Sequence, residues 1–111
     1  MRLEFTPSRM KEEVVLERRG DSLVINGEAF DFAPLPEGAE LSAEAIESDW
    51  FTGVVRREGG VLHLSVRLPH GAHAPDETLF PAPVIMSQDG PVPTPPYDSN
   101  DNNEEAQNGQ D

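Results

Sequence analysis

Residues 22–32 read SLVINGEAFDF, and this stretch decides the fold. Two short apolar runs, at 22–25 and 28–32, flank the pair Asn26-Gly27, and Phe30 and Phe32 follow one another at the strand period of two. Asn-Gly between two such runs is the strongest short-range hairpin signal, because both central positions of a type I′ turn take positive φ. The stretch therefore predicts an antiparallel β-hairpin.

A second hairpin is predicted further along the chain, where the segments 53–58 and 61–68 flank Gly59-Gly60. The second of these segments alternates between apolar and polar residues, as expected for a strand with one buried and one solvated face. The apolar set is Leu62, Leu64, Val66 and Leu68, and the polar set is His63, Ser65 and Arg67.

The remaining body of the chain also has strand signals. Residues 13–18 (EVVLER) precede a turn at 19–21, and residues 2–6 (RLEFT) predict an edge strand that ends at Pro7. Residues 42–47 predict one or two helical turns that begin at Ser42 as the N-cap.

These segments predict a mostly β fold: a small antiparallel meander or sandwich of five to seven short strands with one short helical turn. A small open sheet needs a second layer. The chain itself or a partner protein could supply that layer. The predicted core consists of Phe5, Phe30, Phe32, Trp50, Phe51 and the Leu/Val face of 61–68.

Charge and proline divide the chain into three parts. All 8 basic residues and 13 of the 21 acidic ones lie in residues 1–67, whereas eight of the 11 prolines lie from Pro69 onward. We therefore expect a β body at 1–68 and a Pro-rich strap at 69–97, packed in part on the body. The expected apolar contacts of the strap are Leu79, Phe80, Val84 and Ile85. Residues 98–111 contain no apolar side chain larger than Ala, which predicts a disordered acidic tail.

Composition excludes several classes of function. A chain of 111 residues with a net charge of −13 forms one small domain, and 36% hydrophobic residues predict a small core. Because there are no cysteines, disulfide scaffolds, thiolate zinc sites and cysteine nucleophiles are excluded. The 8 Lys and Arg residues are too few for a duplex-binding surface. No nucleic acid or membrane partner is expected, and the first ten residues do not have the pattern of a signal peptide.

The residue types that could act in catalysis or bind a metal are not arranged in a pattern typical of an enzyme. His70, His73, Asp76 and Glu77 lie within eight residues, but the prolines and glycine among them prevent a helix, so a solvated loop is favoured over a metal site. His63 and Ser65 share a strand face without a third, orienting group. No glycine-rich phosphate loop is present. We therefore predict no catalytic residues, no metal and no cofactor.

Two C-terminal features each allow two interpretations. Residues 91–97 (PVPTPPY) are a polyproline II candidate, which serves either as a ligand of an aromatic groove or, as we favour, as a spacer. The acidic tail at 98–111 either keeps the protein soluble, the favoured reading, or contacts a basic partner.

A partner-binding patch is predicted on the second hairpin and the corner before it. Arg and Trp are enriched at the energetic centres of protein interfaces. The alternative is cross-strand pairing of these arginines with carboxylates such as Glu58, and a core position for Trp50. The candidate residues are Trp50, Phe51, Arg56, Arg57 and Arg67.

The chain also resembles small acidic proteins from the tail or tail-fibre region of tailed phages and prophages of Gram-negative bacteria. The segments that carry this resemblance are INGEAFDF at 25–32, LPEG at 35–38, AIESDWFTG at 45–53, GVLHL at 60–64, LPHG at 68–71, AP at 74–75 and FP at 80–81. Members of that group have no assigned function, so the resemblance transfers no catalytic or binding residues.

The resemblance implies a non-enzymatic accessory protein, either a minor tail component or a factor in tail or fibre assembly. Its partners would be other phage structural or assembly proteins, and it would lie in the host cytoplasm during infection or be associated with the virion. The alternative is a host-directed or regulatory acidic binding protein made during infection. The sequence leaves the oligomeric state open.

Overall fold

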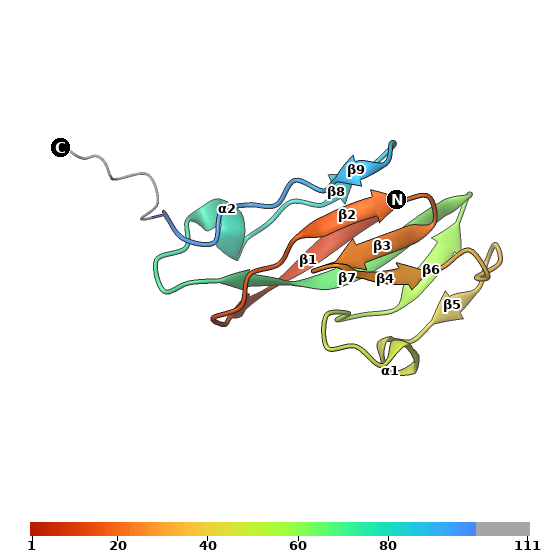
Figure 1. Ribbon diagram of the computed structural model, residues 1–111, viewed down its shortest axis with the longest axis horizontal. Coiled ribbons are helices and arrows are strands. Elements are labelled where there is room, and N and C mark those ends of the chain that lie inside the picture. Colours follow the sequence, from red (N-terminus) through yellow and green to blue (C-terminus); the bar gives the residue numbers. More distant parts are fainter. Residues whose placement is uncertain (100–111) are drawn as a thin grey trace.

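The computed structural model describes residues 1–99, which form two β-sheets packed face to face (Figure 1). The first sheet has the strand order β5-β6-β7-β1-β8, and the second has the order β4-β3-β2-β9. The strands are β1 (Arg2–Arg9), β2 (Leu16–Arg19), β3 (Ser22–Ile25), β4 (Glu28–Asp31), β5 (Glu40–Leu41), β6 (Val55–Glu58), β7 (Val61–His70), β8 (Val84–Ile85) and β9 (Gly90–Pro91). The mostly β fold is thus confirmed.

Both predicted hairpins are present. β3 and β4 are joined by Asn26 (φ 51°) and Gly27 (φ 89°), as a type I′ turn requires, and Gly59 and Gly60, both with positive φ, join β6 to β7. The predicted helical turn is α1 (Ala43–Ile46), whose N-cap Ser42 accepts a hydrogen bond from the Ala45 amide (3.3 Å). A second short helix, α2 (Asp76–Leu79), was not expected.

The N-terminal strand differs from the prediction of an edge strand that ends at Pro7. β1 lies inside its sheet, runs on to Arg9, and pairs in parallel with β7 from Arg2 opposite His63 to Arg9 opposite His70. On its other side β8 pairs only with Arg2 and Leu3. Within residues 1–99, no strand therefore lies on that side at Pro7, where its missing N–H would interrupt a ladder.

The core lies between the sheets. Phe5, Phe32 and Phe51 are buried as expected, whereas Phe30 and Trp50 are only partly buried at its margin. Phe51 packs edge-to-face against Phe30 and Phe32, with ring centroids 5.1 and 5.7 Å apart. The apolar face of β7 is buried as predicted.

The Pro-rich strap contacts both sheets, since β8 extends the first sheet and β9 the second. The prediction of its apolar contacts was wrong for three residues: Leu79, Phe80 (80% exposed) and Ile85 (64% exposed) face outward. Val84 and Met86 pack on the core, and Val92 and Thr78 are buried. Residues 1–99 contain nine strands, more than the five to seven that were predicted. The additional strands are β8 and β9 of the strap and β5, each of which has two residues, too few to leave a periodic pattern.

The start of the chain is fixed against the strap. The Met1 amino group donates to the Met86 carbonyl (3.1 Å), which also accepts from Arg18 Nη1 (2.8 Å). Burial of this amino group and the nearby Arg18 charge lower its pKa. The partly exposed Asp21 has the opposite, smaller effect on this pKa.

The strap ends in ordered structure at the edge of the predicted tail. The Ser99 amide donates to the His73 carbonyl (2.8 Å), and the Gly71 amide donates to the Tyr97 carbonyl (2.9 Å). Asp98 and Ser99 are therefore structured, contrary to the prediction of disorder from residue 98. The rest of the predicted tail, 100–111, lies outside the described residues. Within residues 1–99, none of the helices has the length and apolar character needed to cross a membrane.

The β3–β4 turn allows a direct test of the fold. Gly27→Val places a β-branched side chain at φ 89°, where no atom lies within 4 Å, so the cost is backbone strain alone. We expect a loss of about 1–2 kcal/mol in the free energy of unfolding. For a domain of this size the melting temperature falls by several degrees, measured by circular dichroism. The control Gly27→Asn should cost less, because Asn tolerates positive φ. Equal melting curves for Gly27→Val and the wild type would contradict the turn.

Candidate functional site

An open groove of about 640 Å³ lies where the end of β1, the start of β4 and the segment after α1 meet. Most of its lining side chains are polar or charged, and two, Met10 and Trp50, are large and apolar. The lining residues are Ser8, Arg9, Met10, Glu12, Glu28, Glu47, Ser48, Asp49, Trp50 and Arg67. The groove thus brings together Trp50 and Arg67, two of the five predicted site residues.

Arg67 positions the groove wall. Its Nε donates to the Asp49 carbonyl (3.0 Å) and its Nη1 to Ser8 Oγ (3.1 Å), while its backbone amide donates to the Trp50 carbonyl (2.8 Å). These bonds hold the segment after α1 against β7 and the end of β1. Trp50 is half-buried, so it lines the groove and also packs on the core.

Unpaired carboxylates dominate the charge of the groove. Glu12, Glu28, Glu47 and Asp49 are all exposed, and none forms an ion pair with another residue of 1–99. Two arginines, Arg9 and Arg67, lie among them without ion pairs of their own in that range. The groove therefore combines an aromatic side chain with an excess of negative charge.

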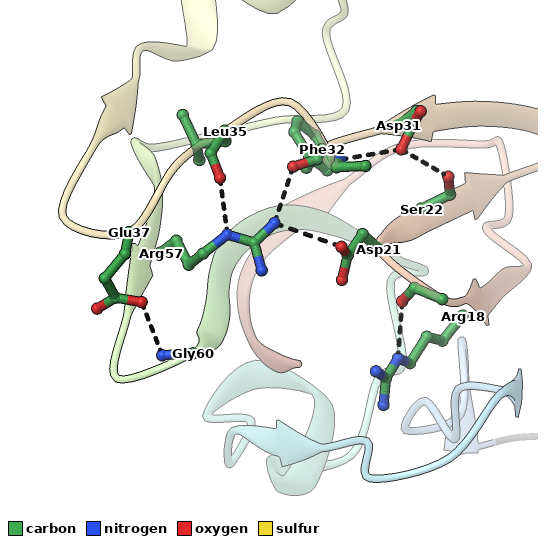
Figure 2. A network of polar contacts seen from close by, with 11 residues as sticks. Arg18, Asp21, Ser22, Asp31, Phe32, Leu35, Glu37, Arg57 and Gly60 are labelled. Atoms are coloured by element: carbon green, nitrogen blue, oxygen red, sulfur yellow. Dashed lines mark hydrogen bonds and ion pairs between the residues drawn. The ribbon is translucent and has the colours of Figure 1, made fainter.

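Arg57 does not belong to an exposed patch. It lies opposite Leu62, on the inner face of its sheet, and its side chain is 15% exposed. Its Nε donates to the Leu35 carbonyl (2.7 Å) and its Nη2 to the Phe32 carbonyl (3.0 Å), with Asp21 at 3.5 Å (Figure 2). Arg57 thus links β6 of the first sheet to the turns of the second sheet, which is a structural role.

The two remaining predicted site residues, Phe51 and Arg56, also lie outside the lining of the groove. Phe51 is 4% exposed, so the prediction of an exposed Trp50-Phe51 corner was wrong for Phe51, whose bridge to Val66 turns its ring into the core. Arg56 lies opposite His63, on the same outer face as Arg67. The four residue steps from His63 to Arg67 span roughly 13 Å, however, so the two arginines are not neighbours. Arg56 pairs instead with Glu58 (3.2 Å).

In the histidine-containing loop at residues 70–77, the contacts of His70 and His73 are with nearby backbone groups. His70 Nδ1 lies 2.9 Å from the Gly71 carbonyl, and the His73 carbonyl accepts from Ser99. In the described part of the chain, no three His, Asp or Glu side chains gather as a metal ion requires. His63 Nδ1 is buried and has no hydrogen-bond partner among the described residues.

The sequence reasoning missed Met10, Glu12, Glu28 and Glu47 as groove residues. They come from three separate segments, and no local pattern links them. The inward position of Arg57, in contrast, had a usable signal: a two-residue turn at Gly59-Gly60 sets Arg57 opposite Leu62, which belongs to the predicted apolar face, and residues opposite each other in a sheet share a face.

No protein-family model, no curated protein and no solved structure matches this chain. The groove and the fold are therefore the observations on which a function has to rest.

Arg57 and Arg56 form a matched pair for testing these roles. Arg57→Ala leaves the Leu35 carbonyl without a donor and removes one of the two donors of the Phe32 carbonyl, which keeps its bond from the Leu35 amide (3.0 Å), so we expect a loss of about 1–3 kcal/mol in the free energy of unfolding. Arg56→Ala removes one exposed ion pair, and a loss below about 0.5 kcal/mol is expected. Urea denaturation of both variants measures the difference. Similar losses in the two variants would show that Arg57 does not join the sheets.

The histidines are predicted to hold no structural metal. The chain folds through its apolar core, so excess EDTA should leave the thermal transition in place, whereas a structural zinc domain would unfold. Circular dichroism with and without EDTA provides the measurement. A loss of β signal on addition of EDTA would instead indicate a metal at His70 and His73.

Proposed function

We propose that this chain is a non-enzymatic accessory protein that acts by binding other proteins. The observation that carries the proposal is the groove whose lining combines Trp50, Met10 and Arg67 with several charged side chains. Aromatic residues, Met and Arg are the residue types enriched at protein interfaces, and Trp and Arg are enriched among the residues that carry most of the binding energy. Small-molecule sites, in contrast, are lined predominantly by apolar side chains.

The biological setting of the proposal is the tail region of a tailed phage or prophage. The resemblance to small acidic phage proteins, which covers most of residues 1–83, supports this setting, in which the chain is a minor tail component or assists tail or fibre assembly. Its partners are then other phage structural or assembly proteins. It acts in the bacterial cytoplasm during infection or as part of the particle.

Particle composition and capture of partners test the proposal together. The tagged full chain is expressed from the encoding phage or prophage, and purified particles and lysate are analysed by mass spectrometry. We expect the chain in particles at a fixed copy number, or bound to phage tail proteins in the lysate. Recovery with host proteins alone would contradict the tail role and support the host-directed alternative.

The groove is tested in the same capture experiment. Trp50→Ala should reduce recovery of the phage partner by about tenfold or more, because truncating an aromatic residue at the energetic centre of an interface costs about 2 kcal/mol or more and about 1.4 kcal/mol is tenfold in affinity. Arg19→Ala, at an exposed position on β2 outside the groove, is the control and should capture normally. Thermal melts show whether both variants are folded. Full capture by a folded Trp50→Ala would place the interface elsewhere.

A further inference from the structure

β4 is a strand at the margin of its sheet with a free outer edge. Three of the four marginal strands, β5, β8 and β9, have only two residues each, and β9 contains Pro91. β4 has four residues, contains no Pro or Lys, and pairs with β3 on one side only. Very short strands, Pro and charged side chains, above all Lys, are the usual features that keep a sheet edge from pairing with another chain. Of these features β4 has only the acidic residues Glu28 and Asp31, which select against an acidic strand.

The hairpin turn determines which backbone groups of β4 face outward. In a two-residue hairpin the residues that flank the turn exchange hydrogen bonds, so Ile25 and Glu28 form such a pair. Hydrogen-bonded and non-hydrogen-bonded pairs alternate along an antiparallel ladder. The pairs that contain Ala29 and Asp31 are therefore not hydrogen-bonded to β3, and their N–H and C=O groups point away from it. The bond from the Phe32 amide to the Asp21 carbonyl (3.0 Å) continues the same alternation.

These outward groups have no partner in residues 1–99. No hydrogen bond to the backbone N–H or C=O of Ala29 or Asp31 is formed there, and both residues are exposed. The Asp31 carboxylate, in contrast, accepts from the Ala33 amide (2.9 Å) and lies 3.3 Å from Ser22 Oγ (Figure 2). The backbone of β4 thus offers two N–H donors and two C=O acceptors, spaced as in a β-strand. The hydrogen bonds of the Asp31 carboxylate hold this strand in position.

The charges around this edge indicate what kind of strand fits it. Glu28 and Asp31 lie at the two ends of β4, and Glu28 also lines the groove with Glu12, Glu47 and Asp49. An extended segment that continues past Glu28 therefore meets the groove beside Trp50, where four unpaired carboxylates outnumber two arginines. Lys or Arg side chains fit both the carboxylates and the Trp50 ring, because they pair with carboxylates and stack on an indole ring.

A second copy of this chain fits the edge poorly. Antiparallel pairing of two β4 strands through Ala29 and Asp31 puts the two Asp31 carboxylates at diagonal positions on the same face. Each copy also has a net charge of −13. Like charges at neighbouring cross-strand positions are destabilising. The carboxylates thus act against self-association and leave the edge open to a basic chain.

We propose that the free edge of β4 accepts an extended, Lys- or Arg-bearing segment of a partner protein by strand addition. The main-chain bonds to Ala29 and Asp31 supply affinity, and the carboxylates of the groove select basic side chains. The inference rests on the proposed function, since it specifies the partner segment that the groove binds.

A synthetic peptide provides the direct test. The full chain is titrated with acetyl-Lys-Val-Lys-Val-Lys-Val-amide, and with the corresponding Glu-Val peptide, while amide shifts and hydrogen exchange are followed by NMR. We expect saturable shifts and slower exchange at the Ala29 and Asp31 amides with the Lys peptide only, weakening as salt is added. Shifts confined to acidic side chains, or no change at Ala29 and Asp31, would overturn strand addition.

Two substitutions at one position separate strand addition from charge attraction. Ala29→Pro removes an N–H that the β3–β4 ladder does not use, so the fold should persist and peptide affinity should fall at least tenfold. Ala29→Thr keeps the N–H and should bind like the wild type. Equal binding by both variants overturns the inference, and so does a dimer of the wild-type chain that Ala29→Pro dissociates.

The same variants distinguish this inference from the proposed function. If Ala29→Pro captures the phage partner normally while Trp50→Ala loses it, the groove binds a partner without strand addition. If neither the wild type nor any variant captures a phage protein, although the Lys peptide binds, the proposed function fails and the edge remains a site for basic strands.

Discussion

The parallel pairing of β1 with β7 is the constraint on which the rest of this structure depends. It is the longest pairing in either sheet and places Leu3 and Phe5 beside Leu64 and Val66 at the centre of the core. Parallel neighbours cannot be joined by a tight turn, because the chain has to return from the end of one strand to the start of the other. Here that return passes through β2, β3 and β4 before β5, α1 and β6, so the crossover supplies three of the four strands of the second sheet that covers the first.

The part of the fold that could be predicted is the part that short segments determine. Asn26-Gly27 and Gly59-Gly60 define two hairpins, and Ser42 caps a helix, because turn and cap geometries depend on a few adjacent residues. The pairing of Arg2–Arg9 with a strand some sixty residues later has no such local signal. Of the predicted site residues, Trp50 and Arg67 line the groove, whereas Arg57 and Phe51 face inward; Phe51 was predicted for both the core and the patch, because residue type alone does not say which face a side chain occupies. The two-residue turn at Gly59-Gly60 was sufficient to set Arg57 opposite Leu62 and therefore inward, but the groove residues Met10 and Glu28 meet only through the tertiary fold.

The Pro-rich strap has a more specific position than its composition suggests. Its segments at Val84–Ile85 and Gly90–Pro91 pair with β1 and β2, so one strap covers a margin of each sheet. Because proline lacks an N–H and the pairings are only two residues long, the newly formed margins offer little backbone to another strand. The strap leaves the opposite margin of the second sheet uncovered, and β4 lies there.

Several arginines bond backbone carbonyls within the fold, so the surface carries a larger excess of acidic groups than the net charge alone indicates. Arg57, Arg18 and Arg67 all direct guanidinium groups to backbone carbonyls, and these bonds link the turns, the strap and the segment after α1 to the sheets. Arg57 and Arg18 are also largely covered, with 15% and 20% of their side chains exposed. The carboxylates of Glu12, Glu28, Glu47 and Asp49, in contrast, remain exposed and unpaired within residues 1–99. Charge far from zero favours solubility, repels copies of the same chain and attracts chains of opposite sign. The arginines that hold the two sheets and the strap together therefore also leave the carboxylates in excess on the surface.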